Sequence, residues 1–224
     1  MNQSSRATDR LTVLVAEDHP VMRDGLATLL ENQGGFTVTG RAASARETRA
    51  LVESRSPQVL LMDLMLQEDD GLALIKDLAF LAPALRIVVF SLHPEEVYAE
   101  RCLRAGAHGY VMKREPVETL FRALHEVANG GIAVSPRLAA AIIGGLNGNA
   151  RKPSGVTLPL TDRELQVFRL IGHPFSSREI AEKLGISLKT VETHRENIKN
   201  KLGLDSGAAL VARAARWVSE PTQG

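Results

Sequence analysis

A short apolar run that ends on one carboxylate constrains the fold of this chain more than any other feature. The run extends from Val59 to Met62 and is followed directly by Asp63. Four apolar residues in succession suit a strand buried on both faces, as in a parallel sheet that helices cover. Open sheets of that kind bind ligands at the carboxyl ends of their strands. Taken alone, Asp63 is better interpreted as a turn or helix-capping residue. Whether it belongs to a ligand site depends on which residues end the other strands.

Strands and helices alternate through the first half of the chain. The predicted strands are Leu11–Ala16, Phe36–Gly40, Val59–Asp63, Leu85–Phe90 and Gly109–Met112. The predicted helices cover about 21–31, 44–55, 71–81, 95–104 and 115–129. Periodicity places two apolar stripes against the sheet, namely Met22, Leu26, Leu29 and Leu30, and Leu72, Ile75, Leu78 and Leu81. Five such units predict an α/β fold with a five-stranded, doubly wound parallel sheet, because each right-handed crossover covers a face.

Polar side chains end four of these strands. Because parallel strands end at one edge of the sheet, we expect these side chains to converge on one crevice; they are Glu17, Asp18, Asp63, Ser91 and Lys113. Three close carboxylates cannot all stay ionised without a cation, and Mg²⁺ is the simplest hard ion that would serve. The lysine and the hydroxyl suit a phosphoryl group, and a carboxylate can be its nucleophilic acceptor.

Residues 11–130 resemble a response-regulator receiver domain of two-component signalling, which has a flavodoxin-like fold. The match consists of the five polar residues above, Gly71 eight residues after Asp63, and Tyr110 three residues before Lys113. The resemblance implies that a partner histidine kinase phosphorylates Asp63. It also implies that Mg²⁺ is held by Glu17, Asp18, Asp63 and the carbonyl of Met65.

The same resemblance assigns roles around the phosphoryl group. Ser91 and Lys113 would grip its oxygens, and movement of Ser91 would let Tyr110 turn inward as a switch. Without the resemblance, Tyr110 is a plain half-buried aromatic. Two positions depart from the usual pattern: Gln67 replaces a proline, and Leu92 follows Ser91 where a small residue is usual. Leu92 could narrow access to Asp63, so we predict altered phosphorylation kinetics with acceptance retained.

The second half carries the signals of a helix-turn-helix. Thr161 with Glu164 and Ser176 with Glu179 are capping boxes, each of which begins a helix. A three-residue turn, Gly185 to Ser187, leads into a third helix from Leu188 to about Leu202. Two short helices joined by a tight glycine turn are typical of a helix-turn-helix. We therefore predict an all-α domain of four helices.

One face of the third helix is polar. Val191, Ile198 and Leu202 share the buried face, whereas small and hydrogen-bonding side chains occupy the other. Such a face suits the major groove of DNA, although a merely solvated face is about equally consistent with this helix alone. The motifs Leu160–Glu164 and Lys189–His194 make the domain resemble the LuxR type, and the whole chain a NarL/FixJ-type response regulator. The resemblance implies base-facing positions and phosphate contacts among Lys189, Thr190, Glu192, Thr193, Arg195, Glu196 and Lys199.

A fourth helix, about Ser206 to Ser219, carries small apolar residues. A homodimer contact would suit the surface formed by Ala208, Val211, Ala212 and Ala215, and would match a two-fold DNA site. Packing within the domain is the alternative for this surface. We thus predict a disordered N-terminus (1–10), a receiver domain (11–130), a linker with a short helix at Leu138–Ile143 (131–157) and a LuxR-type domain (158–219).

Charge and composition agree with a regulator that binds DNA. Residues 1–150 carry 15 Lys and Arg and 18 Asp and Glu, whereas residues 151–224 carry 12 and 8. The basic second half suits a polyanion. The single cysteine, Cys102, permits no intrachain disulfide, and no apolar run approaches the roughly 20 residues of a membrane helix. Because Met1–Arg10 also lacks a signal core, we expect a cytoplasmic protein.

The predicted function is a DNA-binding transcriptional response regulator that phosphorylation of Asp63 activates. A DNA-binding regulator that works without phosphate, with a structural receiver, is the alternative. A phosphatase or hydrolase that uses Asp63 as nucleophile lacks an obvious substrate pocket or second catalytic base, so we do not expect an enzyme.

Overall fold

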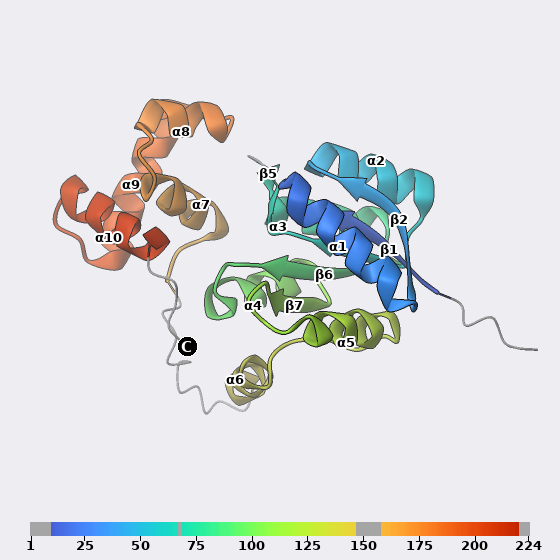
Figure 1. The fold of residues 1–224 in the computed structure, drawn as a ribbon. Helices are drawn as coiled ribbons and strands as arrows, with labels where there is room; N and C mark the ends of the chain where they lie inside the picture. Colours follow the sequence, from blue (N-terminus) through green and yellow to red (C-terminus); the bar gives the residue numbers. More distant parts are fainter. Residues whose placement is uncertain (1–9, 67–68, 147–157, 220–224) are drawn as a thin grey trace, which may run out of the picture. The chain divides into compact units, whose positions relative to one another are not determined.

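The computed structural model describes residues 10–66, 69–146 and 158–219, and Figure 1 shows its fold. The chain divides into two compact units, one up to Gly155 and the other from Val156. Three predicted features fall wholly or largely outside the described residues: the disordered N-terminus (1–10), the departure from the family pattern at Gln67, and the end of the predicted linker at 147–157. Within the described residues, none of the helices is both long enough and apolar enough to cross a bilayer.

The first unit is built on the predicted parallel sheet. Its strands follow the order β2-β1-β3-β6-β7, with β1 at Leu11–Ala16, β2 at Phe36–Ala42, β3 at Val59–Met62, β6 at Arg86–Ser91 and β7 at Gly109–Met112. Register aligns their carboxyl ends, since Ala16 lies opposite Met62 and Ser91 opposite Met112. The residues that follow β1, β3 and β7 therefore emerge at one edge, next to the end of β6.

Helices cover this sheet on both faces. They are α1 (Pro20–Gln33), α2 (Ala45–Arg55), α3 (Gly71–Leu81), α4 (Glu95–Ala105) and α5 (Val117–Ala128). α1 and α5 share one core with the strands, in which Leu30 and Leu124 are fully buried beside Val15 and Leu61. The other three helices pack in sequence, with α3 between α2 and α4. The doubly wound α/β prediction is confirmed.

Details of the first unit differ from the sequence-based expectation. Met22 and Leu81, both predicted to be buried, are 41% and 67% exposed. Both predictions were wrong because these residues lie in the first turn of α1 and the last turn of α3, where a helix extends past the sheet. A small antiparallel hairpin, β4 (Met65–Leu66) with β5 (Asp69–Asp70), was not predicted, since strands of two residues carry no periodic signal.

The connecting segment forms helix α6 (Pro136–Leu146), which begins two residues before the predicted start. Proline suits the first position of a helix because its missing N–H would have no partner there. α6 packs against α4 and so belongs to the first unit. Ala133, just ahead of it, bridges to Gly109 at the edge of β7.

The second unit contains α7 (Asp162–Ile171), α8 (Ser177–Lys183), α9 (Leu188–Leu202) and α10 (Gly207–Ser219) in its described part. Both predicted capping boxes are present, at Thr161 and at Ser176. Gly185, with φ of 60°, makes the turn between α8 and α9 in a left-handed conformation that glycine adopts without strain. The core is closed by Trp217 of α10, whose ring lies 5.6 Å from that of Phe168.

Candidate functional site

At the edge of the sheet, two of the predicted carboxylates lie around the ammonium group of Lys113. Nζ of Lys113 lies 2.6 Å from Oε2 of Glu17 and 2.8 Å from Oδ2 of Asp63. The three side chains are only 6%, 1% and 10% exposed. They come from the ends of β7, β1 and β3, so the topology alone brings them together. The arrangement is a buried carboxylate pair bridged by one cation.

The charge of this cluster is unbalanced. Burial by itself lowers the pKa of Lys113, but the neighbouring Asp63 and Glu17 outweigh it and raise that pKa above its usual value. The ammonium therefore stays protonated and neutralises one of the two carboxylates. Asp18, directly after Glu17, adds a third. Two negative charges thus remain for further cations to balance.

A second donor already lies between two of these carboxylates. Nδ1 of His19 is 2.8 Å from Oδ1 of Asp18 and 3.1 Å from Oε1 of Glu17. Glu17 first, and then Asp18, raises the pKa of this exposed imidazole. One donor atom from each of the three residues lies within 4.8 Å of the others. The oxygens therefore converge on a point that a hard cation could occupy, and the donor set fits Mg²⁺. His19 was not among the site residues predicted from the sequence.

The loop after β3 holds the backbone close to Asp63. The N–H of Met65 donates to Oδ1 of Asp63 at 3.3 Å. A Cβ on Gly71 would lie 2.0 Å from the carbonyl oxygen of Leu64, so only glycine permits this approach of helix α3 to the loop. The spacing of eight residues between Asp63 and Gly71 is thus explained by the return of the chain through β4 and β5. Leu92 points outward and is 71% exposed.

Ser91 and Tyr110, two further site residues predicted for the receiver, are both buried. Ser91 is fully buried; its Oγ accepts the N–H of His93 at 3.3 Å and its carbonyl accepts the N–H of Lys113 at 2.8 Å. The Tyr110 hydroxyl donates to the carbonyl of His93 at 2.8 Å, and the residue is only 2% exposed. Burial raises the pKa of this phenol well above 10. Tyr110 is therefore fully buried where a half-buried aromatic was the alternative, and its switch role stays a prediction.

Helix α9 presents the predicted DNA contacts on its surface. Lys189, Glu192, Thr193 and Glu196 are exposed, whereas Thr190, Arg195 and Lys199 are half-buried. Each glutamate has a basic partner one turn further along: Glu192 with Arg195 at 3.7 Å and Glu196 with Lys199 at 2.9 Å. The Thr193 hydroxyl donates to the carbonyl of Lys189, which leaves its oxygen able to accept a hydrogen bond from a base.

Buried polar contacts fix α9 against its neighbours. Glu164, only 3% exposed, accepts the N–H of Thr161 at 2.7 Å and the ammonium of Lys201 at 2.6 Å. Burial raises the pKa of Glu164, but the hydrogen bonds from Lys201 and Thr161 outweigh it and leave that pKa below 4.5. Arg163 donates to the carbonyl of Leu184 at the end of α8. The capping role of Glu164 was predicted from the sequence, whereas its bond to Lys201 of α9 was not.

Helix α10 divides its apolar residues between two faces. Leu210 and Ala214 are fully buried within the unit. The predicted dimer residues lie on another stripe, with Ala208, Val211 and Ala212 exposed and Ala215 half-buried. Packing within the unit therefore accounts for the first stripe and leaves most of the second at the surface.

Comparison with known proteins agrees with this two-part organisation. Residues 13–125 match the response regulator receiver domain, and residues 158–214 match the bacterial regulatory proteins of the luxR family. The chain is 34% identical over 211 residues to the oxygen regulatory protein NreC of Staphylococcus aureus (strain JH9), covering 92% of this chain and 97% of that protein.

Solved structures of similar proteins include complexes with DNA. RcsB from Salmonella enterica serovar Typhimurium, bound to the rprA promoter in the presence of the phosphomimetic BeF3-, superposes with a TM-score of 0.67 at 25% identity, over 95% of this chain and all of that one. A structure of two RcsB dimers bound to two parallel DNAs superposes with a TM-score of 0.71 at 25% identity, over 92% and 99% of the two chains.

Proposed function

The chain belongs to the response regulators that join a receiver domain to a LuxR-type DNA-binding domain, and on this premise we propose that Asp63 is its phosphoacceptor and α9 its DNA-reading helix. The observation that carries the proposal is the ammonium of Lys113 within 2.8 Å of Asp63 and 2.6 Å of Glu17. That geometry holds a positive charge where the oxygens of a phosphoryl group would need one.

The proposed chemistry is transfer of a phosphoryl group from a histidine of a partner kinase. A carboxylate oxygen of Asp63 attacks phosphorus, an O–P bond forms, and the P–N bond to the imidazole breaks. The imidazole keeps the electron pair and takes up a proton. Asp63 suits this role better than Glu17, because its side chain is 10% exposed and that of Glu17 only 1%. Lys113 then balances charge on the transferred group, and the Ser91 hydroxyl contributes a neutral donor.

The residues that would hold Mg²⁺ are Glu17, Asp18, Asp63 and the carbonyl of Met65. The support is the donor set itself: carboxylates of Glu17 and Asp18 already converge on a single nitrogen of His19. Mg²⁺, when bound, would neutralise the charge that gathers on the phosphoryl oxygens. His19 would have to give up its position between the carboxylates, and its 77% exposure leaves it free to turn outward.

The proposed output is binding to promoter DNA as a dimer. Thr193, Glu192 and Glu196 face the bases, and a glutamate can accept a hydrogen bond from N4 of cytosine. Lys189, Thr190, Arg195 and Lys199 contact phosphates. The surface stripe of α10 formed by Ala208, Val211, Ala212 and Ala215 contacts its copy on the partner. The inward Tyr110 links the Asp63 site to the rest of the receiver.

The test is to map the phosphoryl group. We expect a small phosphodonor with Mg²⁺ to give one adduct, which peptide mass spectrometry after borohydride trapping assigns to Asp63. Asp63→Asn should carry none, and Asp77→Asn, at an exposed surface position, should be labelled like the wild type. An adduct on another residue, or none on the wild-type chain, would overturn the proposal.

A further inference from the structure

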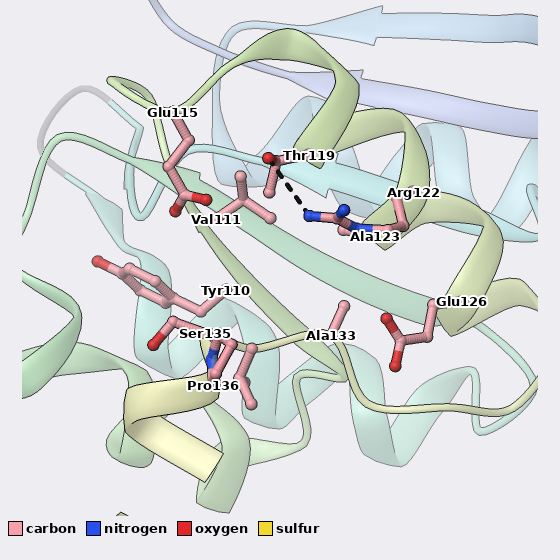
Figure 2. A pocket seen from close by; sticks show the side chains of 11 residues that line it. Tyr110, Val111, Glu115, Thr119, Arg122, Ala123, Glu126, Ala133, Ser135 and Pro136 are labelled. Carbon is pink, nitrogen blue, oxygen red and sulfur yellow. Dashed lines mark hydrogen bonds between the residues drawn. The ribbon is translucent and has the colours of Figure 1, made fainter. Parts of the chain in front are cut away.

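The segment between α5 and α6 is fixed to the edge of the sheet beside Tyr110. The N–H of Tyr110 donates to the carbonyl of Ala133 at 2.8 Å, and the N–H of Ala133 donates to the carbonyl of His108 at 2.9 Å. These bonds extend the sheet beyond β7 by one bridge. Figure 2 shows the resulting cleft, with Tyr110 on β7 near Ser135, at the segment that leads into α6. The start of α6 is therefore tied to the residue proposed as a switch.

Helix α6 is also attached to the first turn of α4 by two polar contacts, which we name the α4–α6 contact. Oγ of Ser135 donates to Oε1 of Glu95 at 2.5 Å, and Nη1 of Arg137 lies 3.1 Å from Oε1 of Glu96. The Ser135 hydroxyl also accepts the N–H of Leu138 at 3.1 Å, so it caps α6 while holding α4. One serine thus joins the two helix starts.

A continuous path of contacts leads from Asp63 to this junction. Lys113 bonds Asp63 through its ammonium and the Ser91 carbonyl through its backbone N–H. His93 then bonds Ser91 through its N–H, and its carbonyl accepts the Tyr110 hydroxyl. Glu95 and Glu96 follow two and three residues after His93 in the chain. This path of contacts joins Ser91 to the start of the helix whose residues hold α6.

The α4–α6 contact is not a fully satisfied interface. Oε2 of Glu96 is buried and has no hydrogen-bond partner in the described part of the chain. A buried carboxylate oxygen without a partner costs free energy that the single pair with Arg137 offsets only in part. Arg137 itself is 60% exposed, so screening by water weakens its pull. Docking of α6 therefore carries a desolvation cost at Glu96 that undocking would relieve.

We propose that α6 docks and undocks in step with the Asp63 site, so that the α4–α6 contact is the mechanical link between phosphorylation and the segment that leads to the DNA-binding unit. This inference rests on the proposed function of Asp63. It adds a route by which the phosphorylation state of Asp63 affects the segment that follows α5. Occupancy of the phosphoryl site pulls on Ser91 and favours the inward Tyr110, and with it the docked α6. Coupling of this kind is reciprocal: docking strengthens binding at Asp63 by the factor by which binding strengthens docking.

Hydrogen exchange of the full chain tests whether occupancy of the Asp63 site favours docking of α6. Beryllofluoride with Mg²⁺ mimics the phosphoryl group without a covalent bond. We expect it to slow amide exchange over Leu138–Ile143 by about fivefold or more, which is the lower end of typical coupling between sites. Exchange in α2, which packs on β1, β2 and α3, serves as the internal reference.

Substitutions at the start of α6 test whether docking of α6 strengthens binding at the Asp63 site. Ser135→Ala with Arg137→Met removes the α4–α6 contact and leaves α4 unchanged. The matched control is Ser54→Ala with Arg104→Met, which removes a serine and an arginine whose bonds stay within α2 and α4. We expect the first double variant to weaken beryllofluoride binding by the same factor that is measured in exchange, and the control to bind like the wild type. The charge-reversed pair Glu96→Arg with Arg137→Glu, which rebuilds the ion pair and keeps Ser135, should bind beryllofluoride more tightly than the Ser135 and Arg137 variant.

The outcomes separate this inference from the proposed function. If beryllofluoride fails to bind the wild-type chain, the proposed role of Asp63 itself fails. If it binds, but exchange in α6 and affinity in the Ser135 and Arg137 variant do not change, the role of Asp63 stands and the α6 link is overturned. Slower exchange in α6 together with a matching loss of affinity supports the link.

Discussion

The two units of this protein assemble their functional groups in opposite ways. The site in the first unit joins Glu17, Asp63 and Lys113, which are 50 and 96 residues apart, within 2.8 Å of one ammonium. The second unit displays its groups along the single helix α9, where partners are three residues apart. The first arrangement exists only when the whole sheet is folded, whereas the second follows from one helix and its caps.

The two arrangements also differ in how much the fold depends on them. The carboxylates bridged by Lys113 are almost fully buried, but Glu192 and Glu196 are 52% and 61% exposed. Removing one partner of a buried ion pair leaves an uncompensated charge, while exposed pairs contribute little. Function and stability should therefore be coupled in the first unit and separable in the second.

The largest expected effect comes from Lys113→Met, which leaves two buried carboxylates without their cation. We expect the first unit to lose about 3–5 kcal/mol of unfolding free energy, and Mg²⁺ to restore part of it. Both tyrosines, Tyr98 and Tyr110, lie in this unit, so tyrosine fluorescence during urea denaturation reports its unfolding. The exposed Lys76→Met should change stability by less than about 0.5 kcal/mol. Equal effects of the two variants would contradict the buried-cluster account.

Gly71→Ala tests the same unit without altering charge. The new Cβ would lie 2.0 Å from a backbone oxygen, so either α3 or the loop after Asp63 has to move. We expect a loss of about 2–3 kcal/mol and slower phosphorylation, because the Met65 backbone shifts away from Asp63. Gly25→Ala is the control, since nothing lies within 4 Å of a Cβ there. Wild-type phosphorylation by the Gly71 variant would show that this close approach does not position the site.

Glu164→Gln should weaken the second unit by about 2 kcal/mol, through loss of a charged hydrogen bond with Lys201. The pKa of Glu164 is lowered on folding, so its contribution is complete above pH 4.5 and is lost as pH falls through the lower, folded-state value. Trp217 is the only tryptophan and lies in this unit, which makes its fluorescence the reporter. Wild type and variant should converge in stability once the pH has fallen below the lowered, folded-state pKa of Glu164; a gap that stays constant down to the acid transition would refute the assignment.

Substitutions on the exposed face of α9 are expected to have the smallest effects on folding. Lys189→Ala should weaken binding to all DNA sequences alike and reduce the salt slope by about one unit. Glu196→Gln should instead change the preferred base at one position, by about 1–3 kcal/mol. Neither should change stability by more than about 0.5 kcal/mol. Fluorescence anisotropy on a panel of sites measures both, and an equal loss on every sequence for Glu196→Gln would argue against base reading.

The sequence predicted the features that have a local pattern: the strands, the helix caps and the polar residues at the strand ends. The five strands, their order of connection and the capping boxes follow from apolar runs, glycines and the Thr161 and Ser176 signals, and each was found close to its expected position. The convergence of polar strand ends followed from parallel topology alone. Resemblance to known regulators then supplied proposed roles that residue types could not assign, and the switch role of Tyr110 stays a prediction of this kind.

The parts that were missed depend on tertiary contacts with no sequence period. The hairpin of β4 and β5 is too short for a pattern, and the bond from Glu164 to Lys201 spans 37 residues. His19 lies next to Asp18, yet nothing in its neighbours indicated that its ring would turn toward two carboxylates. The attachment of α6 through Ser135 was equally hidden, because a serine before a proline first indicates a turn.

The most direct test of the account is the DNA affinity of the full chain with and without a small phosphodonor and Mg²⁺. The DNA is a site selected from random sequence, and Asp63→Asn is measured alongside. We expect the phosphodonor to tighten DNA binding by the wild type about fivefold or more and to leave the affinity of Asp63→Asn unchanged. Equal affinity of both proteins under both conditions would contradict it, and the receiver would then be a structural partner of an independent DNA-binding domain.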